Sequence, residues 1–299
     1  MNTISRLNRK TPYFDRNEAG EFLAQEIMLR LGPGAVSHSR RHKANAVSTL
    51  AGRAPTLVIG LCRGGVPVAR TVARILQVPF DFLVVRKLST QSNPELAIGA
   101  LAECRQRERL PTKQDVDKRQ PPARRLPTGV DRKRDASVKP EINSCDHEAQ
   151  TDFRPTSETN STVMEVLNRD ILAHLTDAEA ALAGARDRET AELHRRVMLY
   201  RAGTAPRRLE GRRVILVDDG AATGATMKAA IASARKQGAC EIIVALPVAP
   251  EEVCGELRKE ADMVICPWTP AFFMSVGSHY THFPQVEDEE IYEGAQRGV

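Results

Sequence analysis

The sequence predicts an α/β fold in which a doubly wound, mainly parallel sheet carries helices on both of its faces. Short apolar runs alternate along the chain with stretches whose apolar residues recur at helical spacing. The runs are continuously apolar, which is typical of strands buried on both faces of a parallel sheet. Charged and glycine residues follow several runs directly, at the carboxyl ends of strands where such folds bind ligands.

The predicted elements follow one another in a regular order. The first strand covers 56–61, and the apolar face of a helix follows it between 66 and 76. Further strands are predicted at 82–85, 214–217, 242–246 and 263–266, and further helices around 227–234 and 253–257. A longer helix is predicted from a capping box at Thr176 and Glu179 to a stop near Gly203.

Composition narrows the class of protein. The 299 residues are 41% hydrophobic and 27% charged, which is ordinary for a globular chain of this length. No apolar run approaches the roughly 18 residues of a membrane span, and the basic N-terminus lacks the apolar stretch of a secretory signal. The six cysteines include no CxxC pair and indicate reduced thiols. We therefore expect a cytoplasmic protein without a membrane partner.

One region interrupts the regular pattern and divides the chain. We predict an N-terminal tail at 1–12, a domain formed by 13–103 and 161–299, and an insertion at 104–160. The insertion is basic and rich in Pro, Ser and Thr, and its lack of hydrophobic periodicity predicts disorder. Clustered Arg and Lys can attract nucleic acid. Because few aromatic residues accompany them, a solvated linker is favoured over a nucleic-acid site.

The stretch Val214 to Ile231 reads VILVDDGAATGATMKAAI and carries the main functional signal. Asp218 and Asp219 end a predicted strand, where two carboxylates repel each other unless hydrogen-bond donors lie between them. The neighbouring hydroxyls of a ribose are such donors. The small residues that follow let backbone N–H groups approach a phosphate at the start of the next helix, where the helix dipole is positive. A diol site beside a phosphate site predicts ribose 5-phosphate as part of the ligand.

VILVDDGAATGAT resembles the motif that binds phosphoribosyl pyrophosphate (PRPP) in type I phosphoribosyltransferases. The segments VIGLCRGGVPVA, FLVVRKLSTQSNPELAIGALAE, VALPVAP and FFMSVGSHYTHFPQV resemble a subgroup called predicted phosphoribosyltransferases, over roughly residues 13–103 and 163–292. The resemblance implies the type I fold with a small C-terminal hood. It also implies transfer of 5-phosphoribosyl from PRPP to a nitrogenous base with release of pyrophosphate, within nucleotide metabolism. Mg²⁺ as a cofactor without a dedicated protein site, and a homodimer, are further implications.

The resemblance also assigns roles to individual residues. Asp218 and Asp219 would hold the ribose hydroxyls, Arg63 would meet the pyrophosphate, and Lys87 would lie over the leaving diphosphate. The remaining PRPP-binding residues would be Gly64 and Gly65 in the pyrophosphate loop and Gly220, Ala221, Ala222, Thr223, Gly224 and Thr226 in the 5-phosphate loop. Cys62, beside the pyrophosphate loop, would make activity sensitive to oxidation.

The acceptor base is not identified by these motifs. Members that act on 6-oxopurines commonly carry a third acid where this sequence has Ala222, so hypoxanthine and guanine are disfavoured. The aromatic residues of the C-terminal segment are candidates to stack on a base, with core packing as the alternative interpretation: Trp268, Phe272, Phe273 and Tyr280. The alternative function is a non-catalytic PRPP-binding regulator that contacts nucleic acid through the insertion. The presence of both Arg63 and Lys87 favours the enzyme.

Overall fold

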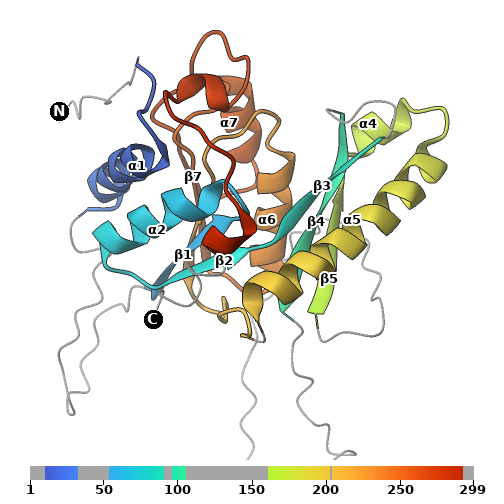
Figure 1. The fold of residues 1–299 in the computed structure, drawn as a ribbon, viewed down its shortest axis with the longest axis horizontal. Coiled ribbons are helices and arrows are strands. Elements are labelled where there is room, and N and C mark those ends of the chain that lie inside the picture. The colour runs from blue at the N-terminus through green and yellow to red at the C-terminus, as the bar shows by residue number, and fades with distance from the viewer. Residues whose placement is uncertain (1–10, 33–53, 91–95, 106–160, 203, 292–299) are drawn as a thin grey trace, which may run out of the picture. The chain divides into compact units, whose positions relative to one another are not determined.

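The computed structural model describes residues 11–32, 54–90, 96–105, 161–202 and 204–291 (Figure 1). From residue 106 onward, the insertion predicted at 104–160 lies outside the described residues, as do residues 1–10 of the predicted tail. The disorder predicted for the insertion therefore stays a prediction. Among the described residues, no helix is long and apolar enough to cross a membrane.

The central sheet has five strands, and every neighbouring pair in it is parallel. Its order is β2-β1-β6-β7-β8, so β1 and β6 lie side by side at its centre although they are far apart in the sequence. The strands are β1 (Thr56–Leu61), β2 (Phe80–Leu83), β6 (Arg213–Val217), β7 (Glu241–Ala245) and β8 (Met263–Ile265). This arrangement confirms the prediction of a mainly parallel α/β sheet.

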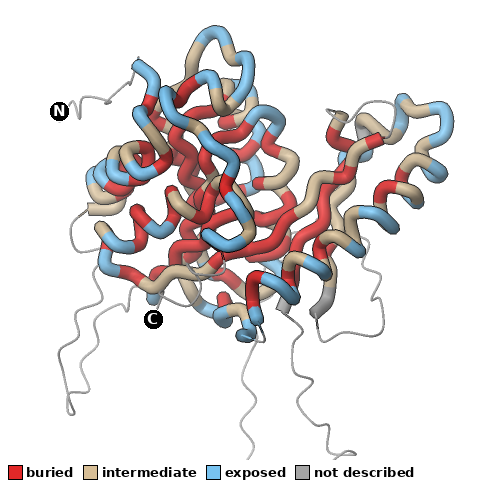
Figure 2. The backbone as a smooth tube through the Cα atoms, viewed as in Figure 1, coloured by how far each residue is buried: buried red, intermediate tan, exposed pale blue. Residues whose placement is uncertain are grey.

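Helices cover both faces of this sheet, as expected for a doubly wound fold. On one face, α1 (Arg16–Leu31) and α2 (Gly65–Leu76) pack against alternate strand residues such as Val58 and Ile215. On the other face, α6 (Ala225–Lys236) and α7 (Glu251–Leu257) pack against residues such as Leu216. The buried positions gather between the sheet and these helices (Figure 2), where apolar surface removed from water stabilises the fold.

A second, antiparallel sheet of three strands was not predicted. It consists of β3 (Val85–Ser89), β4 (Ala97–Arg105) and β5 (Ser161–Leu167), in the order β3-β4-β5. The apolar run predicted as one strand at 82–85 is divided: β2 ends at Leu83 in the parallel sheet and β3 begins at Val85 in the antiparallel one. Because both parts are buried, their hydrophobicity gave no sign of the division.

The long helix predicted before the binding motif is α5 (Ala178–Arg201), preceded by the short α4 (Arg169–Ala173). Its N-cap is Asp177, between the two residues of the expected capping box. α5 packs against β3 and β4 (Figure 1), and its buried residues Leu193 and Val197 belong to the core of this second sheet. The polar residues on another side of α5 reach the cleft described below.

The C-terminal segment after β8 returns over the carboxyl end of the parallel sheet. It contains the 3-10 helix η1 (Gly277–His279) and is tied to the N-terminal part of the chain by a bridge between Tyr13 and Tyr280. The hydroxyl of Tyr13 donates a hydrogen bond of 3.0 Å to the carbonyl of Pro247. Val286 and Ile291 are buried near α5 and anchor the end of the segment. This segment corresponds to the predicted hood.

Candidate functional site

A cleft of about 520 Å³ opens at the carboxyl ends of β1 and β6. Because these strands are parallel neighbours, the loop after β1 and the acid pair after β6 reach the same edge of the sheet. Six predicted site residues line the cleft: Arg63, Gly64, Lys87, Asp218, Asp219 and Thr226. Five Arg and Lys side chains and two Asp side chains line it in total, so its charge suits an anionic ligand.

The loop after β1 packs directly on the acid pair. A Cβ atom added to Gly64 would overlap Oδ2 of Asp219, so the Asp219 side chain would have to move away from its place beside the loop. Glycine at this position therefore lets the loop approach Asp219 closely enough to place Arg63 and the acid pair in one cleft. The glycines predicted from the pyrophosphate-loop pattern thus have a packing reason that holds without any ligand.

The two acids have unlike surroundings. Asp219 is buried, and Oδ2 of its carboxylate accepts a hydrogen bond from Nε of Arg16 at 3.0 Å and forms an ion pair with Nη2 at 2.9 Å. Asp218 is less buried, and its Oδ1 accepts from the backbone N–H of Asp219 at 2.9 Å. Burial raises the pKa of Asp218, and the charge of Asp219 raises it further. Burial also raises the pKa of Asp219, while the charge and hydrogen bonds of Arg16 oppose that rise.

Arg16 is a site residue that the sequence reasoning missed. It occupies the first turn of α1, directly after the N-cap Asp15. Its Nη1 donates to the carbonyl of Pro284 at 2.7 Å, and its guanidinium carbon lies 3.8 Å from the centroid of the Phe283 ring. A cation in the first turn of a helix is unfavourable, because the helix dipole is positive there. The placement of Arg16 was therefore the sequence feature that could have indicated an acidic partner elsewhere in the chain.

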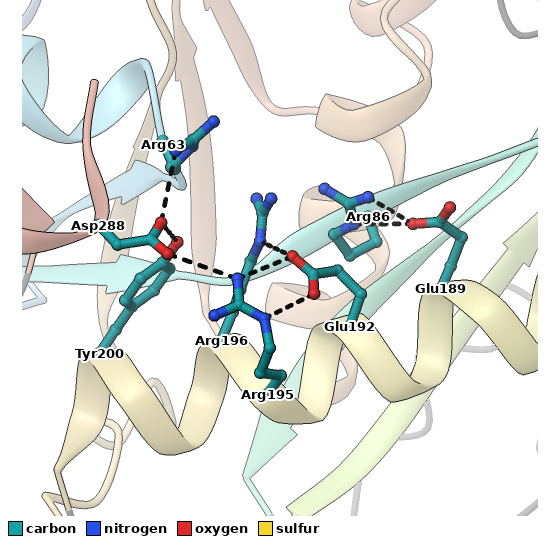
Figure 3. A network of polar contacts seen from close by, with 8 residues as sticks. All are labelled: Arg63, Arg86, Glu189, Glu192, Arg195, Arg196, Tyr200 and Asp288. Atoms are coloured by element: carbon teal, nitrogen blue, oxygen red, sulfur yellow. Dashed lines mark hydrogen bonds and ion pairs between the residues drawn. The ribbon is translucent and has the colours of Figure 1, made fainter. Parts of the chain in front are cut away.

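Arg63 reaches the cleft from the loop after β1 and contacts the C-terminal segment. Its Nη1 lies 3.4 Å from Oδ1 of Asp288, which also accepts from the hydroxyl of Tyr200 at 2.5 Å (Figure 3). Oδ2 of Asp288 lies 3.4 Å from Nη2 of Arg195. The Tyr200 hydrogen bond, together with these arginines, lowers the pKa of Asp288 despite partial burial. Asp288 carried no signal in the sequence analysis.

Further arginines of the cleft are held by acids of α5 (Figure 3). Nε of Arg86 donates to Glu189 at 2.8 Å, and Nε of Arg196 donates to Glu192 at 2.7 Å. Glu192 also binds Arg195, whose hydrogen bonds lower the pKa of Glu192 to about 2. One face of α5 therefore holds several guanidinium groups in place along the cleft.

Lys87 lines the cleft from a strand. The structure pairs it with Ala100 across β3 and β4. Residues 91–95, which connect these strands, lie outside the described residues. The position of Lys87 in a ladder of backbone hydrogen bonds fixes its backbone near the cleft.

The predicted 5-phosphate loop connects β6 to α6. Ala221 and Gly224 are buried, Ala222 and Thr223 are exposed, and Thr226 lines the cleft from the first turn of α6. Gly224 is the N-cap of α6 and has φ of 73°, a conformation that favours glycine. The loop therefore places a helix N-terminus and a hydroxyl at the edge of the cleft, in the arrangement that suits a phosphate.

The aromatic residues predicted to stack on a base are placed differently from one another. The ring of Trp268 lies edge-on to His279 with centroids 4.7 Å apart, and Phe273 stacks on His279 at 4.9 Å. Phe272 is 78% exposed. None of these three is among the described residues that line the cleft, where the aromatic ring present is that of Phe283. Core packing, the alternative interpretation, describes Trp268 and Phe273, and base stacking by these residues stays a prediction.

Cys62 lines the cleft beside Arg63. Burial is the main cause that raises the pKa of its thiol well above the ordinary value, and the charge of Glu103 adds to this effect. Because the thiolate is the form that reacts, a thiol held protonated is a poor target for oxidation. Burial therefore disfavours the reactive form of Cys62, and the oxidation sensitivity expected from the sequence stays a prediction.

Comparison with known proteins identifies the family. The model of the phosphoribosyl transferase domain matches residues 29–118 and 168–280, and the chain belongs to this family. Two proteins of Mycobacterium tuberculosis, named "Putative phosphoribosyl transferase Rv0571c" (strain H37Rv) and "Putative phosphoribosyl transferase MT0597" (strain CDC 1551), are each 34% identical to the chain over 251 residues. The match covers 84% of this chain and 43% of each relative, so the chain spans less than half the length of these relatives.

A solved structure extends the likeness to the fold. The crystal structure of the protein TT1426 from Thermus thermophilus is 27% identical in sequence and superposes with a TM-score of 0.58. The similarity covers 95% of this chain and 98% of that chain. The resemblance to phosphoribosyltransferases stated from the sequence is thereby confirmed, and so is the α/β fold class.

Proposed function

We propose that the chain transfers 5-phosphoribosyl from PRPP to a nitrogenous base and releases pyrophosphate. The observation that carries this proposal is the meeting of three sequence-distant groups in one cleft. These are Arg63 after β1, Lys87 on β3, and the acid pair with Thr226 after β6. A ribose carrying one phosphate and one diphosphate matches these groups in number and in charge.

The geometry suggests a task for each group. The ribose hydroxyls donate to at least one carboxylate of the acid pair, and the 5-phosphate accepts from the backbone N–H groups and Thr226 at the start of α6. Arg63 and Lys87 face the diphosphate. As the bond between ribose C1 and the diphosphate oxygen breaks, its electron pair leaves with pyrophosphate, whose growing charge these cations stabilise. A nitrogen of the base then forms the new bond to C1 and loses its proton.

Mg²⁺ is part of this proposal. Among the described residues, no group of three or more His, Cys, Asp or Glu side chains comes together to hold a metal. The donors at the cleft are the adjacent carboxylates, one of which is bound to Arg16. This donor set fits an ion that keeps most of its ligands on substrate oxygens and water, as Mg²⁺ commonly does. When bound, the ion would neutralise part of the diphosphate charge.

Several finer expectations remain proposals drawn from the resemblance. They are the homodimer, the cytoplasmic location, the role in nucleotide metabolism and the absence of a nucleic-acid partner. The acceptor base stays open, and the side chain of Ala222 can supply no acid to a 6-oxopurine. The alternative function, a regulator that binds PRPP without turnover, requires the same cleft, and only an assay for turnover separates it from the enzyme.

The test is pyrophosphate release from PRPP and Mg²⁺ across a panel of purine and pyrimidine bases. We expect release with one base or one class of base, and its loss in Asp218→Asn/Asp219→Asn protein whose fold is checked by circular dichroism. PRPP binding without release from any base would favour the regulator. If folded protein binds no PRPP, both functions are wrong.

A further inference from the structure

The acid pair behaves as two different residues although its members are adjacent. The side chain of Asp219 is 12% exposed and is enclosed by the loop at Gly64 and by Arg16. The hydroxyl of Tyr280 donates to the backbone carbonyl of Asp219 at 2.6 Å and fixes its main chain. Asp218 is more exposed than Asp219 and lines the cleft. Within the described residues, the hydrogen bond given for its carboxylate comes from the backbone N–H of Asp219.

We infer that Arg16 is the positioning residue of the ribose site. It neutralises Asp219, so that Asp218 is the acid that accepts from the ribose hydroxyls. This inference rests on the proposed function, because it concerns how the same cleft binds the ribose of PRPP. It differs from the assignment by resemblance, in which both acids hold the hydroxyls.

The contacts of Arg16 keep its guanidinium bound to Asp219. Nε donates to Oδ2 of Asp219, Nη2 forms an ion pair with the same oxygen, and Nη1 donates to the carbonyl of Pro284. The guanidinium also lies over the ring of Phe283, which fixes its plane. Three separate contacts would have to break before Arg16 could leave, and the buried carboxylate would then lack a counter-charge. Arg16 therefore stays on Asp219 when a ligand binds.

Neutralisation of Asp219 by Arg16 reduces the repulsion between the two adjacent acids. Two adjacent carboxylates repel each other, most strongly where one of them is buried, as Asp219 is. Together, Arg16, Asp218 and Asp219 carry one net negative charge. Asp218 is then the carboxylate that is left for the ligand. Removal of Arg16 would leave two adjacent acids with like charge, one of them buried without its ion-pair partner.

The remaining charged groups around the cleft do not replace Arg16. From the loop after β1, Arg63 contacts Asp288; from β3, Arg86 contacts Glu189; and from α5, Arg196 contacts Glu192. The other titratable groups that line the cleft or contact Asp219 are Cys62, Lys87 and Tyr280. Within the part of the chain that the structure describes, Asp219 forms its ion pair with Arg16.

The test compares ribose 5-phosphate and Mg-pyrophosphate as separate calorimetric probes of the two ends of the cleft. In Arg16→Gln we expect ribose 5-phosphate to bind roughly tenfold more weakly at neutral pH, as for loss of one partner of a buried charge pair. Pyrophosphate affinity should change by less than about twofold, since Arg63 and Lys87 remain. Arg30→Gln, at the other end of α1, is the matched control.

A double variant decides whether Asp219 itself touches the ribose. Arg16→Gln/Asp219→Asn removes both charges of the pair, and we expect it to bind ribose 5-phosphate within about threefold of the unmodified chain. Affinity as weak as in Arg16→Gln alone would overturn the inference, because Asp219 would then be a direct ligand. Equal loss of affinity for both probes would also overturn it, because Arg16 would then act only through the fold. If Arg16→Gln does not fold, the affinities for ribose 5-phosphate and pyrophosphate are compared in Arg16→Lys and in the double variant.

Failure of this inference and failure of the proposed function have different signatures. If the unmodified chain binds neither PRPP nor ribose 5-phosphate, the proposed function is wrong. If the unmodified chain binds ribose 5-phosphate and Arg16→Gln binds it equally well, the proposed function stands and the role of Arg16 is wrong.

Discussion

The two ends of the cleft use ion pairs in contrasting ways. At the ribose end, Arg16 and Asp219 have side chains that are 10% and 12% exposed, and they form one pair enclosed by backbone. At the diphosphate end, Arg63 and Asp288 are 23% and 26% exposed and belong to an open network along α5 (Figure 3). A buried pair cannot exchange its partner for water, whereas a half-exposed pair can exchange it for a ligand.

This contrast separates the part of the cleft that is built before binding from the part that can rearrange. The Arg16–Asp219 pair joins α1, the end of β6 and, through Pro284, the C-terminal segment. The network on α5 holds Arg63, Arg86 and Arg196 by carboxylates that a diphosphate could replace. The ribose end is therefore expected to respond to substitution in stability, and the diphosphate end in affinity.

The largest expected effect is on stability at the ribose end. Arg16→Gln leaves the carboxylate of Asp219 buried without its counter-charge, and we expect a loss of about 3 kcal/mol in the free energy of unfolding. Arg16→Gln/Asp219→Asn should recover most of this loss. Urea denaturation followed by circular dichroism measures both.

The matched control for this prediction is an exposed pair. Arg74 and Glu21 lie 3.9 Å apart with side chains 69% and 57% exposed, so Arg74→Gln should change stability by less than about 0.5 kcal/mol. A loss in Arg16→Gln as small as that in Arg74→Gln would erase the contrast between the two ends of the cleft.

A smaller effect is expected on affinity at the diphosphate end. Asp288 and the diphosphate of PRPP are both anions that require the guanidinium of Arg63. Asp288→Asn should therefore strengthen Mg-pyrophosphate binding by roughly two- to fivefold, the range of a partly exposed ion pair. Isothermal calorimetry with pyrophosphate measures this change.

Tyr200→Phe sharpens the same prediction. It removes the hydroxyl that donates to Asp288 without touching Arg63 directly, so its effect should have the same sign and a smaller size. Weaker pyrophosphate binding in Asp288→Asn would mean that Asp288 orients Arg63 for the ligand and does not compete with it.

The parts of this site that were predictable lie close together in the sequence. The strand β6, the acid pair and the start of α6 are continuous, so apolar periodicity and small residues revealed them. The loop after β1 was found in the same way. The contact between Arg16 and Asp219 joins residues 203 positions apart, and a local sequence pattern cannot predict a contact between such distant residues. Asp288 was missed for the same reason, being 225 positions from Arg63.

The missed antiparallel sheet has a different cause. Val84 lies between β2 and β3 and is buried like its neighbours, so a continuous apolar run concealed a change of partner strand. Which strand a segment pairs with depends on the fold of distant segments, as β4 and β5 show, because they are separated by residues 106–160. Hydrophobicity alone therefore predicted burial correctly and pairing incorrectly.

The last expected effect is of similar size; it concerns the acids of α5 and depends on pH. The pKa of Glu192 is lowered to about 2 from an ordinary value of 4.5, mainly by its hydrogen bond from Arg195. A carboxyl whose folded pKa is lowered stabilises the fold above its unfolded pKa, and this contribution is lost as pH falls from 4.5 towards 2. Glu192→Gln should therefore lower the free energy of unfolding by about 0.5–1 kcal/mol at neutral pH, a small value because the pair is partly exposed.

The difference between Glu192→Gln and the unmodified chain should narrow as the pH falls from 4.5 towards 2, because protonation removes the charge that the substitution removes. Urea denaturation at neutral pH and at two acidic pH values measures this narrowing. Glu251→Gln is the comparison, because Glu251 pairs with Arg258 and neither residue belongs to the network along α5. A loss above about 3 kcal/mol at neutral pH would place Glu192 in the same class as a buried pair. The open network on α5 would then be as rigid as the ribose end, and diphosphate binding could not proceed by exchange of its partners.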